Sequence, residues 1–230
     1  MKKFLFGLLG IAAVNTGVIV ATSMSTWAEP KVKGYYTMDA MGCMILLECT
    51  KDVKRVNSIE DIRTAYPDTN YDVVADEFDS MLRSLNAVGV KVFLADEKYF
   101  PPMHRGVYHT IGNNFFLNKK WMVKPNRLMS VMRHEGWHAA QDCMAGSINN
   151  SMMAIIKPEE EVPGYWREIV KGTYPAHAVP WEAEAFWAGH TANMTQEALA
   201  ACASDTPMWE IYPPTPMTRE WLVENGHIKD

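Results

Sequence analysis

The sequence predicts an α+β fold in which a small sheet packs against long helices. Two stretches rich in β-branched and aromatic residues, 90–95 and 106–117, have the pattern of short strands. Three longer stretches, 71–86, 127–145 and 180–204, are predicted to be helices from apolar spacing or from the proline and glycine residues at their ends. No repeat or low-complexity linker divides residues 29–230, so we expect one domain there.

The first predicted helix and the strands after it follow directly from residue spacing. The helix over 71–86 has its apolar residues at helical intervals, and Val88-Gly89 ends it. Residues 90–95 (VKVFLA) then have the composition of a strand. Residues 106–117 (GVYHTIGNNFFL) predict two short strands around a turn at Gly112-Asn113.

The two later helices have clear boundaries. Pro125-Asn126 opens the helix over 127–145, and Gly146 is a suitable residue to follow its end. A long irregular stretch, 146–179, comes next, and a loop of that length is uncommon without a function. Pro180 fits the first position of a helix that runs to about residue 204.

The N-terminus has the pattern of an export signal. Two lysines precede an apolar run over residues 4–21, and Thr26 and Ala28 occupy the −3 and −1 positions of a signal-peptidase site. We expect residues 1–28 to be a signal peptide that is cleaved after Ala28. The alternative is an uncleaved signal anchor, because the apolar run approaches the ~18 residues of a membrane span. In both cases the protein is exported and is periplasmic or secreted.

The composition and charge of the chain limit the kinds of partner that the protein can bind. The chain of 230 residues has a net charge of −5, and its basic residues form no long run. We therefore expect no nucleic-acid partner. Apart from a possible N-terminal anchor, no stretch predicts contact with a membrane.

Four cysteines in an exported chain favour disulfides. We expect Cys43 to pair with Cys49 and Cys143 to pair with Cys202. The other two pairings and four buried free thiols remain open alternatives.

The stretch VMRHEGWHAAQDC, residues 131–143, predicts a metal site. His134 and His138 are four residues apart, so both rings lie on one face of the helix and can bind one ion. Glu135 lies ~100° around the helix, where it can reach a metal-bound water but cannot be a third ligand. Zinc suits this set, because it accepts imidazole and carboxylate ligands and lowers the pKa of its bound water. Glu135 would then be the general base.

A third ligand must come from elsewhere in the chain. Metzincins have the pattern H-E-x-x-H-x-x-G-x-x-H, but this chain has Gln141 and Met144 at the last glycine and histidine positions, which excludes that subclass. A glutamate on a second helix is the remaining common arrangement. The segment PWEAEAFWAGH offers Glu182 and Glu184.

The combination of motifs resembles a zincin metallopeptidase of the gluzincin type, in which a second helix carries E-x-x-A. Glu182 and Ala185 match that pattern, although Phe186 stands where an acidic residue often follows. The resemblance implies that Glu182 is the third zinc ligand, with Glu184 as the alternate. It also implies a small mixed sheet packed on the H-E-x-x-H helix and the glutamate-bearing helix. An edge strand there would bind an extended peptide, and residues 113–117 (NNFFL) are the expected edge.

Five further residues are candidates for supporting roles. Asp142 lies four residues after His138 and can orient its ring or cap the helix. His190 lies eight residues after Glu182 and can support a metal ligand. His177 can hydrogen-bond a substrate or an oxyanion, as can Tyr174 and Tyr212.

We therefore predict an exported zinc peptidase that acts on a peptide or protein. Two alternatives stay open: a non-catalytic exported module that keeps the helix pair, and a zinc hydrolase of non-peptide substrates. Glu135 favours catalysis, because a purely structural metal site has no use for a base beside an open ligand position.

Overall fold

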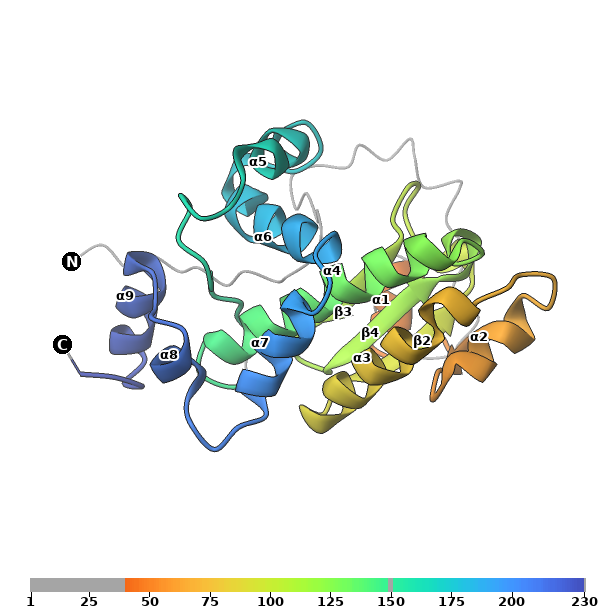
Figure 1. The fold of residues 1–230 in the computed structure, drawn as a ribbon, viewed down its shortest axis with the longest axis horizontal. Helices are drawn as coiled ribbons and strands as arrows, with labels where there is room; N and C mark the ends of the chain where they lie inside the picture. Colours follow the sequence, from red (N-terminus) through yellow and green to blue (C-terminus); the bar gives the residue numbers. More distant parts are fainter. Residues whose placement is uncertain (1–39, 149–150, 230) are drawn as a thin grey trace.

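A computed structural model describes residues 40–148 and 151–229 (Figure 1). The predicted signal peptide and its cleavage site after Ala28 lie outside the described residues. In chain order the elements are α1 (Ala40–Ile45), β1 (Val53–Arg55), α2 (Ile59–Ala65), the 3-10 helix η2 (Asp72–Val74), α3 (Ala75–Ala87), β2 (Lys91–Ala95), η3 (Glu97–Tyr99), β3 (Gly106–His109), β4 (Asn114–Asn118), η4 (Lys119–Trp121), α4 (Pro125–Met144), α5 (Gly164–Lys171), η5 (Ala176–Ala178), α6 (Val179–Gly189), α7 (Met194–Cys202), α8 (Met208–Ile211) and α9 (Pro216–Glu224).

The strands form one mixed sheet in the order β1-β2-β4-β3. β1 is antiparallel to β2, β2 is parallel to β4, and β3 is antiparallel to β4. The predicted α+β class and the small mixed sheet are therefore confirmed. β2 and β4 are interior strands of this sheet, and β1 and β3 are its edge strands.

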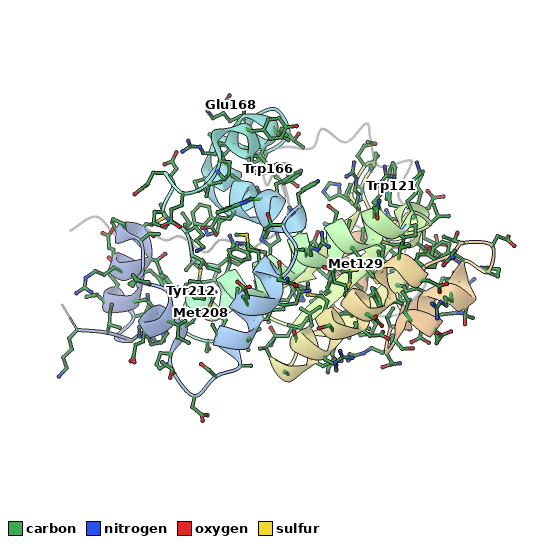
Figure 2. All side chains as sticks on the ribbon, in the orientation of Figure 1. Trp121, Met129, Trp166, Glu168, Met208 and Tyr212 are labelled. Carbon is green, nitrogen blue, oxygen red and sulfur yellow. A yellow bond between two sulfur atoms is a disulfide. The ribbon has the colours of Figure 1, made fainter. Side chains whose placement is uncertain are left out.

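Helices cover both faces of the sheet because its side chains alternate between two apolar surfaces. Phe115 and Leu117 of β4 belong to the main core with residues of α3 and α4, including Met129, which Figure 2 labels. Phe116, between them, faces the opposite way and packs with Val107 of β3 and with α1. Figure 1 shows α3 and α4 on one side of the sheet and α1 on the other.

Helix α4 is the central element of the fold. Its N1 residue is Pro125, as predicted, and Gly146 just beyond its end has a positive φ of 122°. Strand β3 and the helices α3, α6 and α7 all contact α4, and α3 and α7 also contact each other. Gly136 permits the contact with α7, because a Cβ there would lie 2.9 Å from Thr195 Cγ2.

The predictions for the stretches 180–204 and 146–179 were both wrong. The stretch 180–204 is not one helix, because α6 ends at Gly189 and α7 begins at Met194. Asn193 between them has a left-handed φ of 67°, which asparagine tolerates better than most residues. The stretch 146–179 is not wholly irregular, since it contains α5, whose Val170 packs in a small core with Ala183 of α6.

The two predicted disulfides are present. Cys43 pairs with Cys49 at the end of α1, and Cys143 pairs with Cys202, which joins the end of α4 to the end of α7. They are consistent with the oxidising compartment that the sequence predicts. Within the described part of the chain, no helix has the length and apolar character needed to cross a membrane.

The loop lengths predict unequal contributions of the two disulfides to stability. Cysteine separations of 59 and 6 residues correspond to about 4 and about 2 kcal/mol of loop-closure entropy in the unfolded chain. Replacing both Cys143 and Cys202 by serine should therefore lower the free energy of unfolding more than replacing Cys43 and Cys49. Urea denaturation of the two double variants measures this, and equal losses would contradict it.

Candidate metal centre

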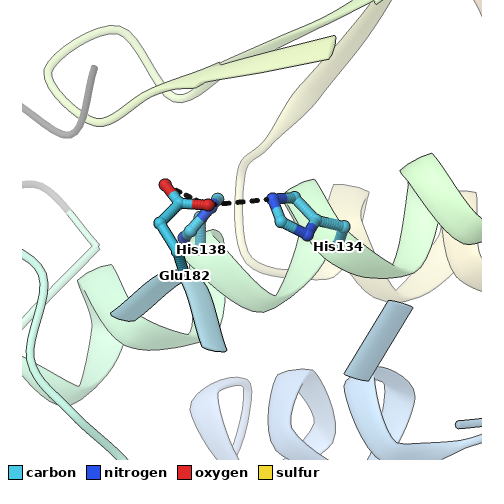
Figure 3. Close-up of side chains that lie close together, drawn as sticks. All are labelled: His134, His138 and Glu182. Carbon is cyan, nitrogen blue, oxygen red and sulfur yellow. Dashed lines mark ion pairs between the residues drawn. The ribbon is translucent and has the colours of Figure 1, made fainter. Parts of the chain in front are cut away.

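His134, His138 and Glu182 converge on one point between α4 and α6 (Figure 3). His134 Nε2 lies 3.4 Å from Glu182 Oε2, and His138 Nε2 lies 3.7 Å from Glu182 Oε1. One potential ligand atom from each residue lies within 4.8 Å of the other two. The two histidines lie on one face of α4, as their spacing predicts, and the carboxylate comes from the second helix.

Small residues on α6 allow this convergence. Ala185 is completely buried in the core. A Cβ at Gly189 would lie 3.1 Å from the Ser130 carbonyl oxygen and 3.3 Å from His134 Cβ, so α6 crosses α4 at short range. Glu182 lies one turn before Ala185 and consequently faces the histidines.

The cluster has the properties of a metal-binding site. Glu182 Oε2 is buried and has no hydrogen-bond partner in the described structure. Burial acts to raise the pKa of Glu182, but the two histidines hold the carboxyl pKa below its usual value. A buried anion with an unpaired oxygen beside two imidazole nitrogens fits a divalent cation, and this donor set suits zinc.

The ring of His138 is held by Gln141, not by Asp142. His138 Nδ1 and Gln141 Oε1 are 2.8 Å apart, and because the amide oxygen can only accept, Nδ1 must carry the proton. The unprotonated Nε2 is then the atom that faces Glu182. Gln141 is itself fixed, since its Nε2 donates to Glu184 at 2.7 Å and to the Trp181 carbonyl at 3.2 Å.

Glu184, the alternate third ligand, has a different position from Glu182. Its carboxylate accepts hydrogen bonds from Trp137, Gln141 and the backbone N–H groups of Ile156 and Lys157. Burial raises the pKa of Glu184 to about 7, although these donors oppose the shift. Its contacts join α4, α6 and the 156–157 segment, and they connect through Gln141 to His138.

Glu135 lies beside the cluster and under the edge strand. A Cβ on Gly106 of β3 would lie 3.0 Å from Glu135 Oε1, so only glycine permits this approach. The backbone of Tyr108 also contacts the Glu135 carboxylate. Burial, reinforced by Glu182, raises the pKa of Glu135 to about 7, against the opposing effect of His134 and Tyr108.

The expected edge at residues 113–117 was wrong, because β4 is paired on both sides. The edge strand beside α4 is β3. Asn118 N–H donates to the Arg105 carbonyl, so the alternation of an antiparallel pair turns the backbone groups of Gly106 and Tyr108 away from β4. These groups face the outer edge, on the side of Glu135.

Asp142 belongs to a separate hydrogen-bond chain. The Tyr108 hydroxyl lies 2.8 Å from Asp142 Oδ2 and 3.0 Å from Asn113 Oδ1, but it has one proton for two acceptors. Burial raises the pKa of Asp142 to about 8. A protonated Asp142 resolves the conflict, because it donates to the Tyr108 oxygen and Tyr108 donates to Asn113.

Of the remaining candidate residues, Tyr174 lies at the metal centre, whereas His190 and His177 lie outside it. The Tyr174 hydroxyl interacts with the Glu182 carboxylate, and burial together with Glu182 and Glu135 raises the pKa of the phenol, which keeps its proton. His190 stacks on Trp166 with ring centroids 4.5 Å apart, at the C-terminal end of α6. His177 is exposed in η5. Sequence reasoning missed Gln141 as a partner of His138, although its i, i+3 spacing was a usable signal.

Comparisons of this chain with protein-family models, with curated proteins and with solved structures returned no match.

The contact between His138 and Gln141 predicts a specific effect on metal affinity. Gln141→Leu removes the acceptor of the Nδ1 proton, and loss of such a partner typically weakens metal binding about 10–100-fold. Asp142→Asn, one residue away on the same helix, should leave zinc affinity unchanged, and His134→Ala should abolish binding. Competition with a chromogenic chelator gives the dissociation constants. Equal affinities of the Gln141→Leu variant and the parent would contradict the assignment.

The raised pKa of Asp142 predicts how stability depends on pH. The folded state keeps a proton that the unfolded chain releases between the usual pKa of 3.8 and about 8. This contribution is therefore present at low pH and is lost as the pH rises through that window, by at most about 1.4 kcal/mol per pH unit. Asp142→Asn removes it, so the stability of the variant relative to the parent should increase with pH. Urea unfolding of both metal-free proteins at several pH values measures the difference, and a constant difference would contradict it.

Proposed function

We propose that this protein is an exported zinc-dependent peptidase with a zincin-like fold. The observation that carries the proposal is the placement of Glu135 beside the His134–His138–Glu182 cluster and under a strand edge. A structural zinc site usually has four protein ligands and needs no base beside them. A hydrolase needs a base next to them and a surface that holds the scissile bond.

The side chains around the centre have the properties that peptide hydrolysis requires. Zinc in this cluster would supply Lewis acidity and an activated water. Glu135 lies beside the cluster, where its carboxylate can take a proton from the attacking water and return it to the leaving amine. The Tyr174 hydroxyl keeps its proton and can donate to the oxygen that gains negative charge.

The outer edge of β3 supports a peptide as the substrate. Backbone groups of Gly106 and Tyr108 face that edge, and we propose that an extended chain adds to them as a further strand, although the residues of β3 are buried and the Tyr108 backbone already contacts Glu135. Such pairing recognises the backbone of a substrate and brings its carbonyl next to Glu135. Non-peptide substrates lack the N–H and C=O pattern that this edge offers.

The proposal predicts that Glu135 is required for hydrolysis and dispensable for metal binding. Glu135→Gln keeps the size of the side chain but cannot accept a proton, so cleavage should fall by about 10²–10⁴. Zinc stoichiometry should stay near one per chain. Incubation with a pool of unfolded proteins and mass-spectrometric detection of new termini measures cleavage, and Glu220→Gln on an exposed part of α9 is the matched control.

Two results would contradict the proposal in different ways. If Glu135→Gln cleaves as fast as the parent, Glu135 is not the base. If the zinc-loaded parent cleaves nothing in the pool, the non-catalytic module is the better interpretation.

A further inference from the structure

A cluster of cations lies at one end of the edge strand. The guanidinium carbons of Arg105 and Arg127 lie 5.8 and 5.2 Å from the centre of the Trp121 ring, and Lys120 Nζ lies 5.9 Å from it. Arg105 directly precedes β3, Lys120 and Trp121 lie in η4, and Arg127 lies in the first turn of α4. We call Arg105, Lys120, Trp121, Lys124 and Arg127 the cationic end. Figure 2 shows Trp121 at the N-terminal end of α4.

The cationic end differs in charge from the chain as a whole, which has a net charge of −5. Lys120 is paired with Glu97 at 2.7 Å. Across residues 40–148 and 151–229, no carboxylate forms an ion pair with Arg105, Lys124 or Arg127. The first turn of α4 also has no acidic residue, so its dipole adds to the positive potential.

The cationic end is continuous with the metal centre. Arg127 precedes His134 by 134 − 127 = 7 residues, which is roughly two turns on the same face of α4 and about 10 Å along its axis. Arg105 directly precedes Gly106, whose backbone meets Glu135. The charge of Arg105 also reaches Tyr174, where it opposes the dominant effect of burial on the phenol pKa.

The direction of the strand fixes which part of a substrate would meet these cations. An antiparallel peptide on the outer edge of β3 runs from the His109 end toward the Gly106 end. Residues after the scissile bond therefore approach Arg105 and Arg127. At about 3.4 Å per residue, a span of about 10 Å corresponds to about three residues.

We propose that the cationic end selects substrates with a carboxylate on the C-terminal side of the scissile bond, about three residues beyond it. The carboxylate is an aspartate or glutamate side chain or the C-terminus of the substrate. This inference rests on the proposed peptidase function. Its basis is unpaired positive charge at one end of a strand edge whose middle holds Glu135.

Cleavage mapping tests the inference in an active enzyme. Peptides from digested cellular protein are incubated with the zinc-loaded parent, and the residues around each new terminus are identified. Acidic residues should be enriched about two- to fivefold over their amides at the second to fourth positions after the cut, as expected for exposed ion pairs. The enrichment should disappear in the double variant Arg105→Gln/Arg127→Gln. It should persist in the matched variant Lys54→Gln/Arg219→Gln, which removes equal charge from exposed positions on β1 and α9.

A binding measurement separates this inference from the proposed function. Fluorescently labelled decapeptides of glycine and aspartate, or of glycine and asparagine, are titrated into the Glu135→Gln variant, each with a free or an amidated C-terminus. The aspartate peptide should bind about two- to fivefold more tightly at about 0.02 M salt, with a smaller difference at about 0.15 M. A preference that depends on the free C-terminus alone identifies the terminal carboxylate as the group recognised.

The outcomes are distinct. Equal binding of all four peptides overturns the inference, as does a preference for either carboxylate that survives removal of Arg105 and Arg127. Tighter binding of the aspartate peptide, in a protein whose zinc-loaded parent cleaves nothing, supports the cationic end and contradicts the proposed hydrolysis.

Discussion

The close crossing of α4 and α6 is the constraint on which the rest of the centre depends. Small residues at Ala185 and Gly189 keep the helices close, because even a Cβ at Gly189 would crowd Ser130 and His134 and a larger side chain would shift Glu182 relative to the two histidines. The same crossing places Glu184 against Trp137 and Gln141, so one packing contact positions both the third ligand and the residue that fixes His138. The electrostatics of the site therefore follow from the volume of two small side chains.

Several buried acids lie close together around this crossing, and their environments separate their roles. Glu184 has four N–H donors, Asp142 has a tyrosine partner, and Glu182 has two imidazoles. Glu135 is buried against the backbone of β3 and interacts electrostatically with His134 and Glu182. The groups that each carboxyl faces distinguish it from the others. Burial of an ionised carboxyl costs free energy unless such groups compensate for the lost solvation.

Structural features that depend on nearby residues could be predicted from the sequence, whereas features that depend on contacts between distant segments could not. The histidine pair, the boundaries of α4 and the strand at 91–95 depend on nearby residues, and the sequence was sufficient for them. The choice of Glu182 came from a motif on its own helix. By contrast, the identity of the edge strand depends on the parallel pairing of β2 with β4, which no local pattern specifies. The break between α6 and α7 lies at Asn193, whose left-handed backbone the apolar pattern of residues 180–204 did not indicate.

The disulfide between Cys143 and Cys202 encloses a segment of the chain that contains Glu182. The two histidines come together when α4 forms. Glu182 lies on a tether, which is the segment between Cys143 and Cys202 whose two ends the disulfide joins. A closed tether limits the volume that Glu182 can explore and raises its effective concentration near the two rings. Oxidation of the chain thus favours the arrangement in which Glu182 lies beside the two histidines.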